Sequence, residues 1–329
     1  MSNILYELVG FGAVTAEGGM KALDATSNGA FSVGKDGVKA IFATAARKLE
    51  LIGFEDKTMA YVPSAIGYDA YYPVRPVSLE KPIEAVLMDL DGTSVKSEEF
   101  WMWIIEQTMA EVKCDPSFRL VPEDFPYVAG HSIGEHLSYC IDKYIPGFSL
   151  DAARRCYNAK VEYEMREIMA GRGKKGVFTP ATGLKDFLLE LKERNIKIGL
   201  VTSGLYEKAM PEIISAFQTL GMGDPTVFYD AIITAGTLFG KGSTGTLSEL
   251  PIKPHPWLYA ETGRFGLGML FENRSRVVAI EDSGAGACSA RLAGYTTIGI
   301  GGGNIVSSGT KDFCTYYEPD LNSILNKII

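Results

Sequence analysis

Short apolar runs alternate with amphipathic stretches along the C-terminal part of the chain. The runs have the length of buried strands and predict strands at 85–88, 196–201, 228–234, 276–280 and 296–300. Apolar residues at helical spacing predict helices at 184–191, 206–220, 258–265 and 285–293. Strands that alternate with helices form parallel sheets with both faces covered, so the pattern predicts an α/β fold.

A helical pattern interrupts this alternation between the first two strands. Helical spacing is clear at 97–112 and 150–170, and no run between them resembles a parallel strand. We therefore expect a helical insertion at 96–179, within a core formed by 81–95 and 180–329.

Residues 1–80 form an N-terminal extension that fits neither pattern. Apolar residues at helical spacing predict a helix over 38–52, with Gly53 as a stop signal. The stretch 60–83 is rich in Tyr and Pro and predicts an extended, rigid segment along a surface. Two interpretations stay open. The extension could be a decoration packed on the main domain, or it could be either a lid over the site or a dimer arm through which the protein forms a homo-oligomer.

Polar residues follow three of the predicted strands at the point where each strand ends. These residues are Asp89 and Asp91, Thr202 and Ser203, and Glu281 and Asp282. Side chains alternate along a strand, so Asp89 and Asp91 point the same way. Ligands bind at the carboxyl ends of parallel strands, so we expect the three pairs to converge on one crevice.

Composition and charge narrow the classes of function. A net charge of −8 argues against non-specific binding of nucleic acid or anionic membranes. The first apolar stretch contains Glu7, and no basic residue precedes Lys21, so we expect no signal peptide. No apolar run reaches the roughly 18 residues of a membrane span. Five scattered cysteines without a C-x-x-C motif favour reduced thiols in a cytoplasmic protein.

The predicted crevice concentrates negative charge. Asp89, Glu281 and Asp282 would raise each other's pKa unless a cation compensates them. Mg²⁺ favours carboxylate and phosphate oxygens, so it is the expected cofactor. Lys253 adds a positive charge that suits a phosphate group.

The remaining residues of the crevice predict phosphoryl chemistry. Thr202 and the backbone N–H groups of Ser203 and Gly204 stand at a helix start, where phosphate oxygens bind. Asp89 can attack phosphorus and form an aspartyl-phosphate. Asp91 can protonate the leaving oxygen and then deprotonate the attacking water.

Four motifs, in this order, resemble those of the haloacid dehalogenase-like (HAD) hydrolase superfamily. They are Asp89-Leu90-Asp91-Gly92-Thr93, Thr202-Ser203, Lys253-Pro254 and Glu281-Asp282. The resemblance covers about 81–95 and 180–305, and the helical insertion resembles the type-1 cap of that superfamily. It implies a Rossmann-like core, and a cap that opens and closes over the substrate. It also implies Mg²⁺ held by Asp89, the Asp91 carbonyl and Asp282, with support from Glu281.

Asp91 also indicates the branch of the superfamily. Dehalogenases and phosphonatases lack an acid at that position, so a phosphate ester of a small metabolite, such as a sugar phosphate, is favoured. β-Phosphoglucomutase-like members carry a His and a cap-loop Arg where this chain has Trp101 and Ile133. A phosphatase is therefore favoured, with a mutase or a non-catalytic phospho-ligand-binding protein as alternatives.

Three polar residues of the insertion are candidates for substrate recognition. His131, Glu135 and His136 lie in the stretch 130–137, which we expect to be a loop that could face the site. A helix-capping or surface role is the alternative for them. His255, between two prolines, is expected to shape its own loop.

Overall fold

The computed structural model describes residues 3–45, 47–63, 69–124, 133–174, 176–237 and 252–329, without the side chains of Ile133 and Glu135. The chain divides into two compact units. The first unit comprises 1–94, 181–209 and 222–329, and the second comprises 95–180 and 210–221. The expected cap, 96–179, lies within the second unit, which also takes in part of one helix from the expected core.

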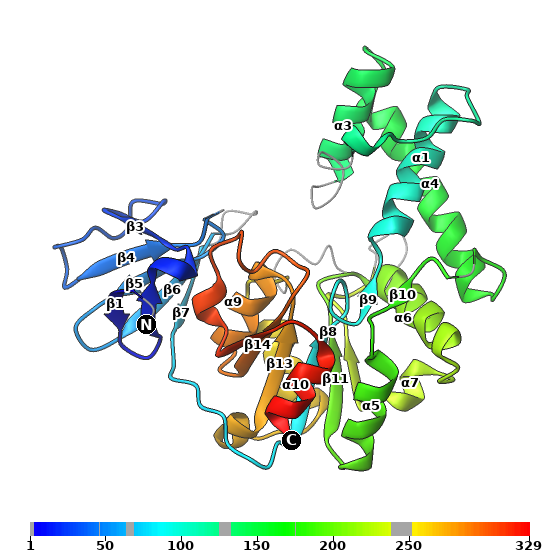
Figure 1. Ribbon diagram of the computed structural model, residues 1–329. Coiled ribbons are helices and arrows are strands. Elements are labelled where there is room, and N and C mark those ends of the chain that lie inside the picture. Colours follow the sequence, from blue (N-terminus) through cyan, green and yellow to red (C-terminus); the bar gives the residue numbers. More distant parts are fainter. Residues whose placement is uncertain (1–2, 46, 64–68, 125–132, 175, 238–251) are drawn as a thin grey trace. The chain divides into compact units, whose positions relative to one another are not determined.

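A six-stranded parallel sheet forms the centre of the first unit (Figure 1). Its strands are β8 (Ala85–Asp89), β11 (Lys197–Val201), β12 (Ala231–Ile233), β13 (Val277–Glu281), β14 (Thr296–Ile300) and β15 (Tyr316–Glu318). The spatial order is β12-β11-β8-β13-β14-β15, and every neighbouring pair is parallel. This is the Rossmann order, in which the direction of winding reverses between β8 and β13. The α/β prediction is therefore confirmed.

Helices follow the strands of this sheet, and those predicted at 184–191, 206–220, 258–265 and 285–293 are found close to these positions. They are α5 (Leu184–Glu193), α6 (Tyr206–Leu220), α7 (Pro225–Phe228), α8 (Trp257–Glu261), α9 (Gly284–Leu292) and α10 (Leu321–Ile328). A π-helical turn at Thr262–Gly266 continues α8, and short 3-10 turns occupy Phe271–Arg276 and Lys311–Phe313. The apolar pattern did not predict α7, α10 or β15, and the strand expected over 228–234 is present only at Ala231–Ile233. Strand β15 has three half-buried residues and no apolar run.

The N-terminal extension is a small β module. Its strands are β1 (Ile4–Leu8), β2 (Gly12–Thr15), β3 (Lys21–Leu23), β4 (Ala40–Ala43), β5 (Glu50–Gly53), β6 (Thr58–Val62) and β7 (Ala70–Pro73), with a 3-10 turn at Ala16–Gly18. Strands β3 to β7 form an antiparallel sheet in sequence order, and β1 pairs with β2 in a hairpin.

The helix predicted over 38–52 is therefore wrong. That stretch forms β4 and β5, and every residue of both strands is buried. One face of the sheet contributes to a small cluster with Phe31, and the other contributes to a larger cluster with helix α9. A strand covered on both faces shows no alternation of apolar and polar residues, so its pattern resembles that of a buried helix.

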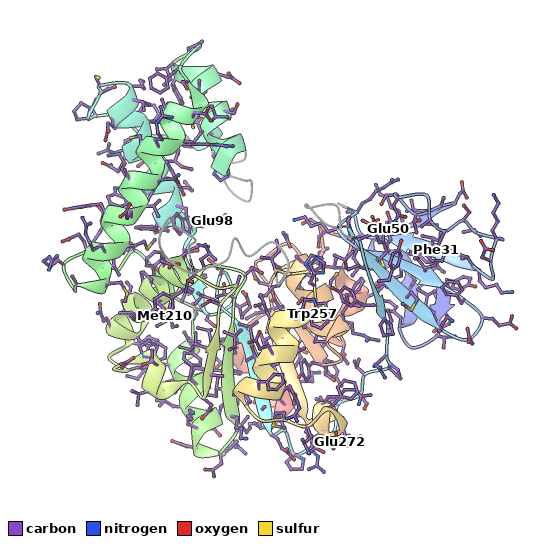
Figure 2. The ribbon with its side chains drawn as sticks, turned by 180° about the vertical axis from the view of Figure 1, so that it is seen from behind. Phe31, Glu50, Glu98, Met210, Trp257 and Glu272 are labelled. Atoms are coloured by element: carbon purple, nitrogen blue, oxygen red, sulfur yellow. The ribbon has the colours of Figure 1, made fainter. Side chains whose placement is uncertain are left out.

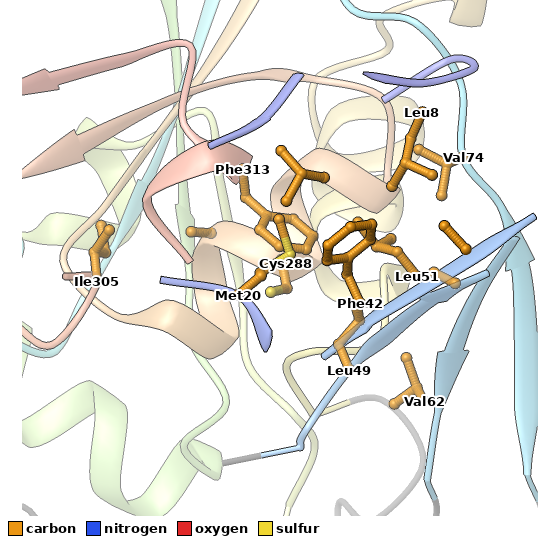
Figure 3. Close-up of a cluster of buried hydrophobic side chains, with 14 residues drawn as sticks. Leu8, Met20, Phe42, Leu49, Leu51, Val62, Val74, Cys288, Ile305 and Phe313 are labelled. Carbon is orange, nitrogen blue, oxygen red and sulfur yellow. The ribbon is translucent and has the colours of Figure 1, made fainter. Parts of the chain in front are cut away.

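The β module shares a hydrophobic core with the parallel-sheet domain (Figure 3). Phe42 and Leu51 of the module belong to the same buried cluster as Cys288 of α9 and Phe313. The guanidinium of Arg291, also on α9, is buried and donates to the carbonyl oxygens of Arg75 (2.6 Å), Gly10 (2.8 Å) and Phe11 (3.2 Å). The extension thus packs on the main domain, as one of the two open interpretations expected.

The second unit is mainly helical. It contains α1 (Glu98–Val112), α3 (Ile133–Tyr144) and α4 (Leu150–Met169), a short 3-10 turn at Pro122–Asp124, and a two-stranded ladder of β9 (Val95–Lys96) and β10 (Thr179–Pro180). The helices expected at 97–112 and 150–170 are confirmed. The loop expected over 130–137 is wrong from Ile133 onward, where α3 begins.

Two further findings concern membrane spans and cysteines. Within the described ranges, no helix has the length and apolarity that a membrane span requires. All five cysteines are free thiols.

Candidate active site

The site begins with the carboxylate of Asp89 at the end of β8. The strand is buried along its whole length, and the Asp89 side chain is only 7% exposed. Beyond the strand, the Ser94 hydroxyl donates to the Asp89 carbonyl (2.6 Å), which fastens the turn that carries Asp91. Gly92 of this turn has φ +83°, and a Cβ there would lie 2.1 Å from a carboxylate oxygen of Asp282. Only glycine therefore fits between the first and last motifs.

Lys253 links the carboxylates of two neighbouring strands. Its ammonium group lies 2.5 Å from Asp89 Oδ1 and 2.6 Å from Glu281 Oε1, and it is 3.4 Å from the Val201 carbonyl. The side chain is 6% exposed. Burial acts to lower the pKa of Lys253, but the two carboxylates outweigh burial and raise it above its usual value.

Glu281 is fully buried at the end of β13 and has hydrogen bonds at both carboxylate oxygens. Oε1 accepts from Lys253 and from the Tyr259 hydroxyl (2.5 Å), and Oε2 accepts from the Ser283 hydroxyl (3.0 Å). A Cβ at Gly286 would lie 1.9 Å from this carboxyl group, so helix α9 needs glycine there. Glu281 is therefore suited to hold Lys253 in place.

Negative charge accumulates where the parallel sheet reverses its winding. Oxygen atoms of Asp89, Glu281 and Asp282 lie within 4.8 Å of one another. Burial and the neighbouring Glu281 carboxylate raise the pKa of Asp89 well above its usual value. The same two causes raise the pKa of Asp282 to about 7. The protein alone thus leaves this group of carboxylates short of positive charge.

These residues fit a hard divalent cation. Carboxylate oxygens are the ligands that Mg²⁺ prefers, and the raised pKa values show that added positive charge would be favourable here. Because both oxygens of Glu281 already accept hydrogen bonds, Asp89 and Asp282 are the better candidates for direct ligands. Thr93 lies beside them, and its hydroxyl donates to Asp282 Oδ1 (3.4 Å).

The second motif forms a turn after β11, the strand that pairs with β8 on the side opposite β13. Thr202 is buried, and its Oγ1 accepts from the Gly204 N–H (2.9 Å), so its hydroxyl hydrogen is directed elsewhere. The Ser203 hydroxyl accepts from the Lys253 backbone N–H (3.0 Å) and ties this turn to the lysine loop. The Gly204 N–H expected to bind phosphate is thus used inside the turn.

Three residues of the site lie outside the four motifs, and the sequence analysis did not identify them. Tyr259 and Ser283 complete the shell around Glu281. Lys208 lies in the first turn of α6, and its ammonium group is 3.0 Å from Asp91 Oδ1. The helical spacing of α6 could have placed Lys208 near the second motif, but not near Asp91, because the register of β8 and β11 decides that approach.

The candidates in the insertion belong to the second unit, so the structure does not relate them to this site. His131 lies outside the described residues, and so does the side chain of Glu135. His136 lies on α3, not in a loop, and its side chain is 8% exposed. A role in substrate recognition stays a prediction for all three.

Three solved structures have folds similar to that of this chain. A HAD-superfamily hydrolase of subfamily IA from Geobacter sulfurreducens is similar to 77% of this chain over 100% of its own length (TM-score 0.54, 18% identity). A predicted phosphoglycolate phosphatase from Haemophilus somnus is similar over 75% and 98% (TM-score 0.54, 16% identity). A protein from Thermotoga maritima, named provisionally as a β-phosphoglucomutase, is similar over 75% and 98% (TM-score 0.52, 17% identity).

The TM-scores show a shared fold, and at identities of 16–18% the similarity shows the fold alone. Family assignment rests on the sequence match, in which residues 86–300 fit the haloacid dehalogenase-like hydrolase family. That span begins in β8, ends with β14 and includes all four motifs. The chain therefore belongs to the haloacid dehalogenase-like hydrolase family.

Proposed function

We propose that the protein is a Mg²⁺-dependent phosphatase that hydrolyses a phosphate monoester of a small metabolite, such as a sugar phosphate. One observation carries the proposal: the buried Asp89 carboxylate contacts the Lys253 ammonium at 2.5 Å, two residues before a second carboxylate, Asp91. A nucleophile next to a fixed positive charge, with a separate acid–base group nearby, is what phosphoryl transfer through a covalent intermediate requires.

The first half of the reaction forms the covalent intermediate. An Asp89 carboxylate oxygen attacks phosphorus, a new P–O bond forms, and the bond from phosphorus to the substrate oxygen breaks. The Asp91 carboxyl group gives its proton to the departing oxygen, so the product leaves as a neutral alcohol. Lys208, at 3.0 Å from Asp91 Oδ1, orients the Asp91 side chain.

The second half returns the enzyme to its starting state. The Asp91 carboxylate takes a proton from water, the water oxygen bonds to phosphorus, and the aspartyl P–O bond breaks. Inorganic phosphate leaves, and Asp89 is again a carboxylate. Throughout, the Thr202 hydroxyl and the Lys253 ammonium offer hydrogen bonds to the phosphoryl oxygens.

The cofactor in this proposal is Mg²⁺. Asp89 and Asp282 would hold it through their carboxylates, and the family resemblance adds the Asp91 carbonyl. When bound, Mg²⁺ supplies positive charge that neutralises the carboxylates and the phosphoryl oxygens.

The test compares Asp89→Asn with a matched surface variant, Asp56→Asn, on an aryl phosphate in Mg²⁺. Asp56 is exposed and lies in the turn between β5 and β6. We expect Asp89→Asn to lower kcat by about a thousandfold or more, and Asp56→Asn to leave it unchanged. Wild-type turnover by Asp89→Asn would refute the assignment of the nucleophile. Conversion of β-glucose 1-phosphate to the 6-phosphate without phosphate release would favour a mutase instead.

A further inference from the structure

The loop that carries Lys253 is held by the N-terminal β module. Two residues after Lys253, the His255 side chain is buried, with 6% of its surface exposed. Its Nδ1 shares a hydrogen bond of 2.8 Å with the hydroxyl of Tyr72, which lies on β7 of the module. The two rings meet edge to face, with centroids 5.9 Å apart. A module outside the catalytic core thus contacts the loop of a catalytic candidate.

The parallel-sheet domain holds the same residue from another side. The Ser289 hydroxyl of α9 donates to the His255 carbonyl oxygen (2.5 Å). His255 N–H donates to the Ile252 carbonyl (3.0 Å), which closes a tight turn around Lys253. His255 is therefore the point at which helix α9 and the β module both fasten the lysine loop.

Aromatic packing extends the contact beyond one hydrogen bond. Trp257, which begins α8 (Figure 2), packs edge to face on Tyr72 with centroids 5.8 Å apart. Tyr72 thereby contacts the chain on both sides of Pro256. The module itself is fixed to α9 by the shared core and by the buried Arg291, so it offers a rigid support.

We propose that Tyr72 is a positioning residue for the phosphoryl-transfer site, and that it acts through His255 on Lys253. The proposal rests on the proposed function for the role of Lys253. It assigns the N-terminal module to the catalytic apparatus: without the Tyr72 hydroxyl, the loop loses its hydrogen bond to the module and keeps those to Ser289 and Ser203.

The physical reason lies in the short distances at Lys253. Its ammonium must stay 2.5 and 2.6 Å from two carboxylates while it faces a phosphoryl group. Contacts between charged groups weaken steeply when geometry is lost, and buried sites depend on preorganised donors. A loop that shifts by a fraction of an ångström therefore weakens binding of phosphate and of the transition state.

Tyr72→Phe removes one oxygen atom and keeps the ring that packs on Trp257. The matched control is Tyr71→Phe, the preceding residue of β7, whose side chain lies on the opposite face of the sheet. Tyr71 also uses its hydroxyl, which accepts from Asn28 Nδ2 (2.7 Å), and its ring stacks on Tyr61. Both variants lose one tyrosine hydroxyl from the same strand, but only one loses the contact with the lysine loop.

Two variants of His255 sharpen the test. His255→Ala removes the side-chain hydrogen bond, whereas the amide of His255→Asn can replace Nδ1. We expect Tyr72→Phe and His255→Ala each to lower kcat/KM by about threefold to tenfold, the effect of one lost hydrogen bond. The affinity for inorganic phosphate in Mg²⁺, measured by calorimetry, should fall by a similar factor. His255→Asn should recover most of the loss.

A double variant and a comparison of thermal stability distinguish a positioning role of Tyr72 from a general structural role. The double variant Tyr72→Phe/His255→Ala should be no worse than His255→Ala, because both changes break the same contact. Thermal unfolding of Tyr72→Phe and Tyr71→Phe should occur at similar temperatures. Purely structural roles would give additive losses and no recovery by His255→Asn.

Equal phosphate affinity and equal kcat/KM for Tyr72→Phe and Tyr71→Phe would overturn the proposal. The phosphate measurement keeps it separate from the proposed function: a wild-type protein that binds phosphate but releases none from aryl phosphates refutes the phosphatase, and the affinity comparison then decides the role of Tyr72. A wild-type protein that binds no phosphate in Mg²⁺ overturns both.

Discussion

Two buried groups of charges in this protein invite comparison, one in each compact unit. In the helical unit, Asp124 is fully buried and accepts from Lys143 Nζ (2.5 Å), from the hydroxyls of Tyr139 (2.9 Å) and Tyr144 (2.6 Å), and from the Val121 N–H (2.9 Å). Burial alone would raise the pKa of Asp124, but these donors outweigh burial and lower it to about 2.

At the candidate active site, in contrast, carboxylates outnumber ammonium groups. The Lys253 ammonium contacts the carboxylates of Asp89 and Glu281, and the Asp282 carboxylate lies close to both. The pKa values of Asp89 and Asp282 are raised. One carboxylate with four donors stabilises the fold around it. Three carboxylates short of positive charge repel one another, and a bound cation would relieve that repulsion. The comparison distinguishes an ion pair that stabilises the fold from a group of charges suited to bind a cation.

The largest expected effect is that of removing the divalent cation. EDTA should lower turnover of an aryl phosphate by about a thousandfold or more, and Mg²⁺ should restore it, because it supplies charge that the described residues lack. Mg²⁺ at about 100 times its dissociation constant should also stabilise the protein by about 2.7 kcal/mol. Asp282→Asn should lose that stabilisation in thermal unfolding, whereas Asp56→Asn should keep it. Full activity after exhaustive chelation would contradict the account.

Removing the ammonium of the site should have the next largest effect. Lys253→Met leaves Asp89 and Glu281 buried without their shared partner, so we expect kcat/KM to fall about a hundredfold and stability to fall by about 3 kcal/mol. The control is Lys39→Met: Lys39 is half exposed and lies 3.6 Å from Glu55. Steady-state kinetics and urea unfolding measure the two effects, and a Lys253→Met enzyme with wild-type kcat/KM would show that the contact is only structural.

The structural group should respond in stability and in its pH dependence. Because the pKa of folded Asp124 lies below its ordinary value of 3.8, its contribution is complete above about pH 5 and is lost as pH falls toward 2. Asp124→Asn should lower the free energy of unfolding by about 2 kcal/mol at pH 7, and the difference from wild type should shrink below pH 4. The control in urea unfolding is Asp142→Asn, an exposed residue of α3 next to Lys143 in the sequence. A difference independent of pH would argue against this ion pair.

The smallest expected effect is that of Lys208. This side chain is 37% exposed, and its contact with Asp91 is screened by solvent, so such a pair contributes less than about 1 kcal/mol. Lys208→Met should therefore lower kcat by about twofold to fivefold, through looser orientation of Asp91. The exposed Lys48→Met is the control, and an unchanged kcat for Lys208→Met would remove Lys208 from the mechanism.

The polar pairs at strand ends were predictable because strand length and strand alternation are local properties. Asp89, Thr202 and Glu281 could be placed on one sheet edge from apolar runs alone. The contact of Tyr259 with Glu281 was not predictable, since it depends on how α8 packs against β13. The contact of Lys208 with Asp91 was not predictable either, because it depends on the register of β8 and β11.

The β module shows more plainly that the spacing of apolar residues cannot distinguish a helix from strands buried on both faces. Residues 38–52 carry apolar side chains that face both sides of a sheet, and their spacing imitated a helix. Arg47, between β4 and β5, has φ +50°, a conformation in which glycine is more usual, so no glycine marks the reversal of the chain there. The contact between Tyr72 and His255 joins residues 183 positions apart, so only the tertiary structure reveals it.

The central claim is that Asp89 becomes phosphorylated during turnover. Acid quenching of the enzyme with an aryl phosphate in Mg²⁺, followed by borohydride reduction, converts an aspartyl-phosphate to homoserine, which peptide mass spectrometry locates. The account predicts homoserine at position 89, dependent on substrate and on Mg²⁺. Sustained phosphate release with homoserine at another position, or with none under conditions that trap a known aspartyl-phosphate enzyme, would contradict it.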